Sequence, residues 1–111
     1  FDKINLEVTI MDDAIYTCIN ILCESLPSMR DVLGLTQLEF SRIIGISRQS
    51  VIELEHKKKK TTRAVLLAIT AYFTLREESA KILFEKDFYE NKFVNELGFT
   101  TELVIKIHDW R

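Results

Sequence analysis

The chain has 111 residues, of which 47% are hydrophobic, and its formal net charge is −2 at pH 7. This length suits one domain with a real hydrophobic core and is short for two independent domains. No stretch approaches the roughly 20 apolar residues of a membrane helix, and the first residues lack the pattern of a signal peptide, so we expect a cytoplasmic protein without a membrane partner.

The charges are distributed unevenly along the chain. Residues 1–27 contain one lysine and five acidic residues, residues 28–63 contain eight basic and four acidic residues, and residues 64–111 contain six basic and eight acidic residues. The negative total argues weakly against a nucleic-acid partner, but the middle segment alone is basic. A locally basic segment can contact phosphates while the acidic flanks face away.

The first eleven residues alternate between apolar and polar side chains, which predicts a β-strand with one buried face. Asp12 and Asp13 can then cap a helix that carries apolar residues at helical spacing. Its cysteines, Cys18 and Cys23, are five residues apart, which suits neither a metal-binding pair nor a disulfide framework, so we expect buried thiols in a reduced protein. Pro27 should end or kink this helix, because proline removes a backbone donor.

Two short helices separated by one glycine are predicted in the middle of the chain. A helix over about 28–33 ends at Gly34, and Thr36 then caps the first helix of the pair. Gly45 can adopt the left-handed conformation that a tight turn between two helices needs. The apolar positions of the first helix that we expect to face the core are Phe40, Ile43 and Ile44.

The second helix of the pair is capped by Ser47 and should bury Val51 and Leu54. Its outward face is polar and consists of Arg48, Gln49, Ser50 and Glu53. A run of four lysines, residues 57–60, follows as a loop, and Thr61 or Thr62 caps a further apolar helix over Ala64 to Phe73. The residues of that helix available for packing are Leu67, Ala68, Ala71 and Tyr72.

A long aromatic helix is predicted from Glu77 to Leu97, ended by Gly98. A helix that is apolar on so many sides is buried on several of them, so we expect a homodimer interface here, with packing inside one chain as the alternative. The predicted interface residues are Phe84, Phe88, Phe93 and Leu97. In residues 99–110 the alternation favours a strand paired with the N-terminal one, although Thr100 or Thr101 could instead open a short helix.

Residues 28–75 resemble the Xre-type helix-turn-helix domain shared by phage Cro and CI-like repressors and many bacterial regulators. The positions that carry the resemblance are Arg30, Thr36, Gln37, Ser41, Gly45, Ser47, Val51, Leu54 and Glu55. The resemblance implies a mainly α, lambda-repressor-like bundle. Residues 1–27 would extend it with a strand and a helix, and residues 76–111 would form a C-terminal helix and tail that dimerise.

The resemblance also implies roles for individual residues. In the major groove, Arg48 would bond guanine, Gln49 would bond adenine and Glu53 would bond cytosine. The residues predicted to contact the DNA backbone are Thr36, Gln37, Ser47, Ser50, Lys57, Lys58, Lys59, Lys60 and Arg63. Arg30 and Glu55 match an ion pair that ties the first helix to the recognition helix. Lys57 stands where the family commonly has glycine, and a left-handed conformation there costs about 1 kcal/mol.

Catalysis finds little support, because His56 and His108 are isolated and the sequence has no metal-binding pair and no glycine-rich phosphate loop. We expect no enzyme, no metal and no cofactor. The predicted function is a sequence-specific regulator of transcription, a homodimeric repressor on double-stranded DNA. The alternative is a protein-interaction module, such as the antitoxin of a toxin–antitoxin pair that also binds its own promoter, with a toxin or a co-regulator as partner.

Overall fold

The structure is a computed structural model that describes the backbone of residues 2–57 and 61–110, and the side chains of residues 11–57 and 61–110. All regular structure in these residues is helical, which confirms the mainly α class. The elements are α1 (Asp2–Val32), α2 (Gln37–Ile44), α3 (Arg48–Glu55), α4 (Arg63–Thr74), α5 (Glu77–Glu85), the 3₁₀ turn η1 (Phe88–Glu90), α6 (Lys92–Glu96) and α7 (Thr101–His108).

Helix α1 replaces the predicted N-terminal strand, so that prediction is wrong. The alternating pattern misled because the apolar residues Ile4, Val8, Met11 and Ile15 also recur three or four residues apart, which is helical spacing. No glycine or proline separates the two segments, and a helix propagates more easily than it nucleates. The two aspartates at positions 12 and 13 therefore lie inside α1 and cap nothing.

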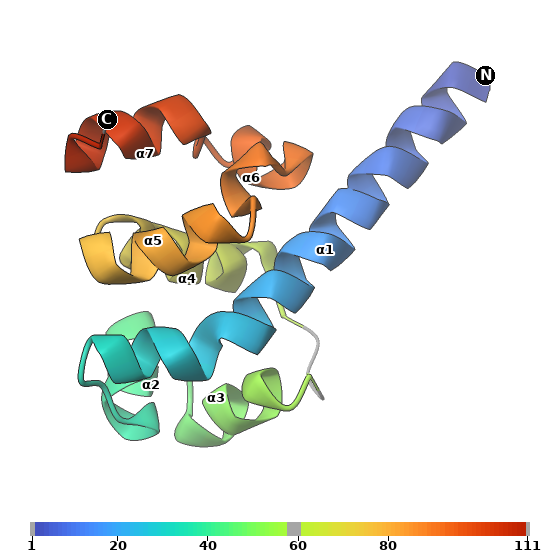
Figure 1. The fold of residues 1–111 in the computed structure, drawn as a ribbon. Coiled ribbons are helices and arrows are strands. Elements are labelled where there is room, and N and C mark those ends of the chain that lie inside the picture. The colour runs from blue at the N-terminus through green and yellow to red at the C-terminus, as the bar shows by residue number, and fades with distance from the viewer. Residues whose placement is uncertain (1, 58–60, 111) are drawn as a thin grey trace.

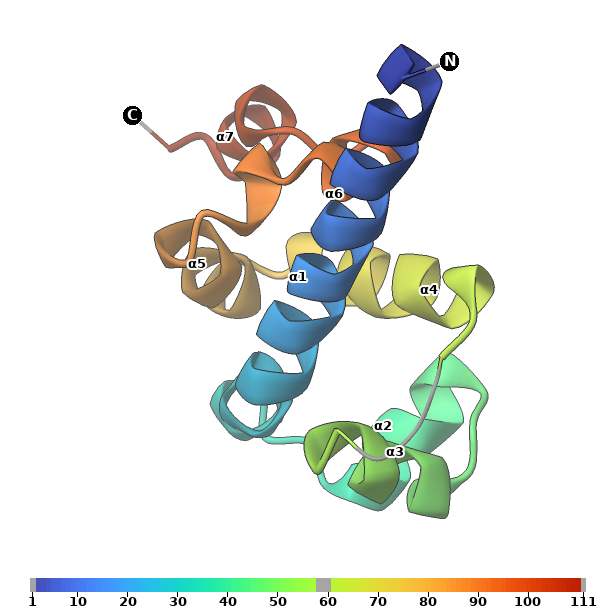
Figure 2. The ribbon, with the colours of Figure 1, turned by 90° about the vertical axis from the view of Figure 1, so that its right-hand side faces the viewer.

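Pro27 lies inside α1 and does not end it. The last turns of the helix instead run in a different direction from the rest, as Figures 1 and 2 show, so the predicted kink is present. The short helix predicted over 28–33 is this terminal part of α1. It ends at Gly34, which is left-handed with φ 68°, and the Leu35 amide returns to the Arg30 carbonyl at 2.8 Å.

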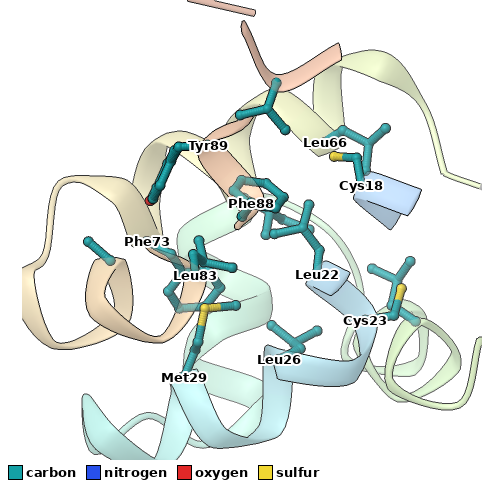
Figure 3. Close-up of a cluster of buried hydrophobic side chains, with 14 of the residues drawn as sticks. Cys18, Leu22, Cys23, Leu26, Met29, Leu66, Phe73, Leu83, Phe88 and Tyr89 are labelled. Carbon is teal, nitrogen blue, oxygen red and sulfur yellow. The ribbon is translucent and has the colours of Figure 1, made fainter. Parts of the chain in front are cut away.

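Helix α1 is the centre of the bundle and packs against α3, α4, α5 and α6. The helix pair α2 and α3 lies at one end, and α6 and α7 lie at the other (Figure 1). One core joins all of these segments, and Figure 3 shows Leu22, Leu26 and Met29 of α1 facing Phe73 and Leu83. Residues 1–27 and 76–111 therefore share their core with the helix-turn-helix segment.

Two predicted core positions point to solvent. Ile43 of α2 is 47% exposed and Leu67 of α4 is 42% exposed, whereas Phe40 is fully buried as predicted. Helix α4 is apolar on nearly every side, so its periodicity does not choose a face. The face that it buries instead carries Leu66, Ile69, Thr70, Phe73 and Thr74.

The long C-terminal helix predicted over 77–97 is broken into three pieces. Asp87 is left-handed, with φ 57°, and ends the continuation of α5. Asn91 then caps α6 by accepting the Phe93 amide at 2.8 Å, and its Nδ2 donates to the Ala14 carbonyl of α1 at 2.9 Å. This chain reversal brings α6 back onto α1 and leaves Gly98 as the end of α6, as predicted.

The C-terminal strand favoured for residues 99–110 is wrong, and the short-helix alternative is correct. Thr100 caps α7, its hydroxyl oxygen accepting the Leu103 amide at 3.1 Å. A strand there had no partner, because the N-terminal segment is itself helical. No helix in the described part of the chain is long and apolar enough to cross a membrane.

Two of the four residues predicted for a dimer interface are buried within the chain. Phe88 is fully buried and Phe93 is 1% exposed, while Phe84 and Leu97 are half-buried. The dimer prediction is therefore wrong for Phe88 and Phe93, because the helix break turns both rings into the chain's own core.

Cys18 is a buried free thiol, and burial raises its pKa to about 12.

Candidate nucleic-acid interface

The turn between α2 and α3 has the geometry that the sequence predicted. Gly45 is left-handed, with φ 85°, and its amide donates to the Ser41 carbonyl at 2.9 Å. The Ile46 amide donates to the same carbonyl at 3.0 Å, so two backbone bonds close the end of α2. Ser41 is 2% exposed, and its small side chain donates to the Leu38 carbonyl at 2.6 Å instead of filling space between the helices.

Both helices of the pair have a side-chain cap at the N-terminus. Thr36 and Glu39 form a capping box, in which the Glu39 amide donates to the Thr36 hydroxyl at 3.1 Å and the Thr36 amide donates to the Glu39 carboxylate at 3.0 Å. The bond from the Thr36 amide holds the pKa of Glu39 below its usual value. Ser47 caps α3 by accepting the Ser50 amide at 3.0 Å.

Helix α3 buries one face and exposes the other. Val51 is fully buried and Leu54 is 4% exposed, so the helix is held against the core. Arg48 and Gln49 are exposed and Glu53 is half-buried. Ser50, which the sequence placed on the outward face, is only 8% exposed, because it packs at the start of α3, where its hydroxyl accepts from the Ser47 hydroxyl at 2.9 Å. The amide of Gln49 donates to the Glu53 carboxylate at 3.5 Å, across one turn. These three predicted base-reading residues therefore share one outward face on a fixed helix.

A network around Glu55 joins three helices. Arg30 of α1 donates from Nε to Glu55 Oε2 at 2.6 Å and from Nη2 to Oε1 at 3.1 Å, and their side chains are only 11% and 6% exposed. The third guanidinium contact goes to the Leu35 carbonyl at 3.0 Å. Gln37, the first residue of α2, donates from Nε2 to Glu55 Oε1 at 3.0 Å.

The sequence did not predict the contact from Gln37 to Glu55. The two residues are 18 positions apart, so no capping or periodicity pattern links them. The geometry of this contact bears on the predicted role of Gln37. An amide nitrogen carries two N–H groups, and the bond to Glu55 occupies one of them. The other N–H remains for an acceptor at the N-terminus of α2, where a phosphate would also meet free backbone N–H groups.

In the loop after α3, the predicted DNA-contacting residue Lys57 forms an ion pair within the chain. Lys57 is left-handed, with φ 57°. Its ammonium donates to Glu24 of α1 at 2.6 Å, and this hydrogen bond raises the pKa of Lys57 and lowers the pKa of Glu24. Lys58, Lys59 and Lys60 lie outside the described residues.

Arg63 begins α4, whose cap Thr62 accepts the Val65 amide at 3.2 Å. The guanidinium of Arg63 lies 5.1 Å from the centre of the Phe93 ring, a cation–π distance. Arg63 is exposed. The structure thus gives Arg63 a contact within the chain that the sequence did not indicate.

Comparison with known protein families decides what this helix pair is. A family model described as Helix-turn-helix matches residues 28–78. This match supports the predicted Xre-type helix-turn-helix family for residues 28–78. The helix-turn-helix domain is the DNA-binding unit of transcription regulators, in a family that is generally not enzymatic. A search of curated proteins and a search of solved structures each found no match.

Proposed function

We propose that the protein is a sequence-specific transcription repressor that binds a two-fold-related operator as a homodimer. Helix α3 of the helix-turn-helix enters the major groove in this proposal. The observation that carries it is the contrast between the two faces of α3, since Val51 and Leu54 fix the helix in the core while Arg48, Gln49 and Glu53 share the outward side.

The outward side chains suit different base edges. The guanidinium of Arg48 can donate two hydrogen bonds to guanine O6 and N7. Gln49 can pair with adenine N6 and N7 through its free amide oxygen and the N–H that Glu53 does not accept. Glu53 can accept from a cytosine amine, and it lies one turn from Gln49, so the two side chains would meet neighbouring base pairs.

Contacts to the DNA backbone position the helix without reading sequence. The N-terminus of α2 offers Gln37 and the backbone N–H groups of its first turn, with Thr36 as cap. Ser47, which is exposed, lies at the corresponding end of α3. We propose that these groups meet phosphates on either side of the groove, and that the lysines at 57–60 and Arg63 add charge nearby.

A protein partner is the second candidate, and one exposed aromatic side chain favours it. Tyr16 of α1 is 69% exposed. Large exposed aromatic residues are enriched where proteins associate. An antitoxin would use such a surface to hold a toxin and would still bind its own promoter through α3.

Selection of bound sequences from a random DNA pool tests the proposal. We expect the purified protein to enrich a palindrome whose half-sites are about one helical turn apart, roughly 34 Å. Arg48→Ala and Gln49→Ala should each relax the preference at one base pair per half-site, whereas Lys92→Ala, at an exposed residue of α6, should leave the selected sequence unchanged. A pool without any enriched half-site would reject sequence-specific binding and favour the protein partner.

A further inference from the structure

Helices α5 and α7 enclose an apolar groove on the flank of the bundle. Its volume is about 510 Å³, and it is lined by Lys81, Phe84, Glu85, Ile105 and Trp110. Helix α7 lies above α5 in both Figure 1 and Figure 2, away from the end that carries α2 and α3. The groove is thus separate from the proposed DNA-binding surface.

The wall of the groove is held in place by contacts to Trp110. Its indole meets the Phe84 ring edge to face, with ring centres 5.3 Å apart, and stacks on His108 at 5.1 Å. The indole N–H donates to the Glu77 carboxylate at 3.1 Å, and His108 donates to the Thr74 carbonyl at 2.7 Å. The aromatic wall is therefore a built surface and not a loose C-terminal side chain.

The rim of the groove carries one charge of each sign. Lys81 and Glu85 are both exposed, four residues apart on the same side of α5. Within the described part of the chain, neither forms an ion pair with another side chain. Because the rim has no net charge, it does not attract a strongly basic or strongly acidic partner. A second copy of the rim in reversed orientation would place opposite charges side by side.

We propose that the occupant of this groove is a second copy of the chain. In a two-fold interface the same surface is used twice, so a residue at one position meets the residue related by the axis. If the two α5 helices lie antiparallel, Lys81 of each copy meets Glu85 of the other, and Phe84 lies between the two charge pairs. Each α5 then packs into the groove between α5 and α7 of the partner.

This inference supplies the interface for the homodimer in the proposed function and rests on that part of it. It keeps Phe84 from the interface that the sequence predicted and excludes Phe88 and Phe93, which are buried in the chain's own core. Because α2 and α3 lie at the other end of the bundle, both recognition helices stay accessible in the dimer (Figure 1).

Charge reversal on the rim tests the interface without disturbing the core. Lys81→Glu and Glu85→Lys change exposed side chains, and far-UV circular dichroism checks that both variants fold. Sedimentation equilibrium without DNA should show the parent as a dimer. Each single variant should dissociate about tenfold more readily, because two attractive contacts become repulsive at once. Lys92→Glu, the same change at an exposed residue of α6, should leave the mass unchanged.

Mixing the two variants is the decisive step. Equal amounts of Lys81→Glu and Glu85→Lys should restore dimerisation, because each variant then meets a partner of opposite rim charge. A parent protein with the mass of one chain at high micromolar concentration would overturn the inference. A dimer that neither variant weakens, or a mixture no tighter than the separate variants, would place the interface elsewhere. The masses are measured without DNA, so loss of DNA binding by a dimeric protein would refute the proposed function alone.

Discussion

Removing the carboxylate of Glu55 should be among the most damaging single changes in the helix-turn-helix. Glu55→Ala removes the acceptor for two guanidinium bonds of Arg30 and for the amide of Gln37. The Arg30 side chain is only 11% exposed, so its charge would remain nearly buried with the Leu35 carbonyl as its contact. Loss of one partner of a buried pair costs about 3–5 kcal/mol, and the slight exposure here favours the lower end.

The measurement is the free energy of unfolding in urea, followed by circular dichroism. A loss of about 3 kcal/mol would be a large fraction of the 5–15 kcal/mol of a typical domain. Glu53→Ala is the matched control, because this half-buried glutamate lies on the same helix and has only the 3.5 Å contact with Gln49. The reasoning fails if Glu55→Ala costs no more than Glu53→Ala, which we expect to be about 0.5 kcal/mol.

A double variant separates the ion pair from general damage. Arg30→Met combined with Glu55→Leu removes both charges and keeps apolar bulk, so it should be more stable than either single change. Gln37 then loses its acceptor in every variant that lacks Glu55. We therefore expect weaker binding to all DNA sequences in the double variant, with an unchanged sequence preference. A change in preference would show that Gln37 reads bases.

Three further outcomes follow from the caps and the core. The pKa of Glu39 is lowered in the folded chain, so its contribution to stability is present above its usual pKa of 4.5 and is lost as the pH falls further; urea unfolding of the parent should show this slope, and Glu39→Gln should reduce it. Gly45→Ala should cost about 1 kcal/mol, measured the same way, because φ is 85° at this position; no loss would mean that the turn relaxes. Cys18 should not react with a thiol reagent at pH 8 until urea unfolds the chain, since it is fully buried and its pKa is raised to about 12; rapid labelling of the native protein would contradict this burial.

The local features of the helix pair could be predicted from sequence, because they depend on residues within one or two turns. Thr36 and Ser47 cap helices, and Gly45 makes the left-handed turn, as their positions indicated. The longer-range contacts could not be predicted in this way. Gln37 meets Glu55 across 18 positions and Lys57 meets Glu24 across 33, and neither pair follows from a periodic pattern.

The flanking segments were harder because their apolar patterns fit more than one structure. The first eleven residues alternate as a strand does, yet they continue a helix whose spacing they also fit. The aromatic segment after Glu77 gave no indication of where it would break. Asp87 and Asn91 reverse the chain there, and the reversal decides that Phe88 and Phe93 pack inward. Apolar content alone does not tell whether a helix is covered by its own chain or by another.

The central claim is that the outward face of α3 selects the DNA sequence. The direct measurement is the ratio of affinities for the selected operator and for a scrambled duplex of equal length, at one salt concentration. We expect the parent to prefer the operator by roughly a thousandfold or more. We expect Gln49→Ala to lower that ratio by about tenfold, with little change in binding to the scrambled duplex. A ratio that is the same for the parent, Arg48→Ala and Gln49→Ala would contradict the assignment of α3 as the recognition helix.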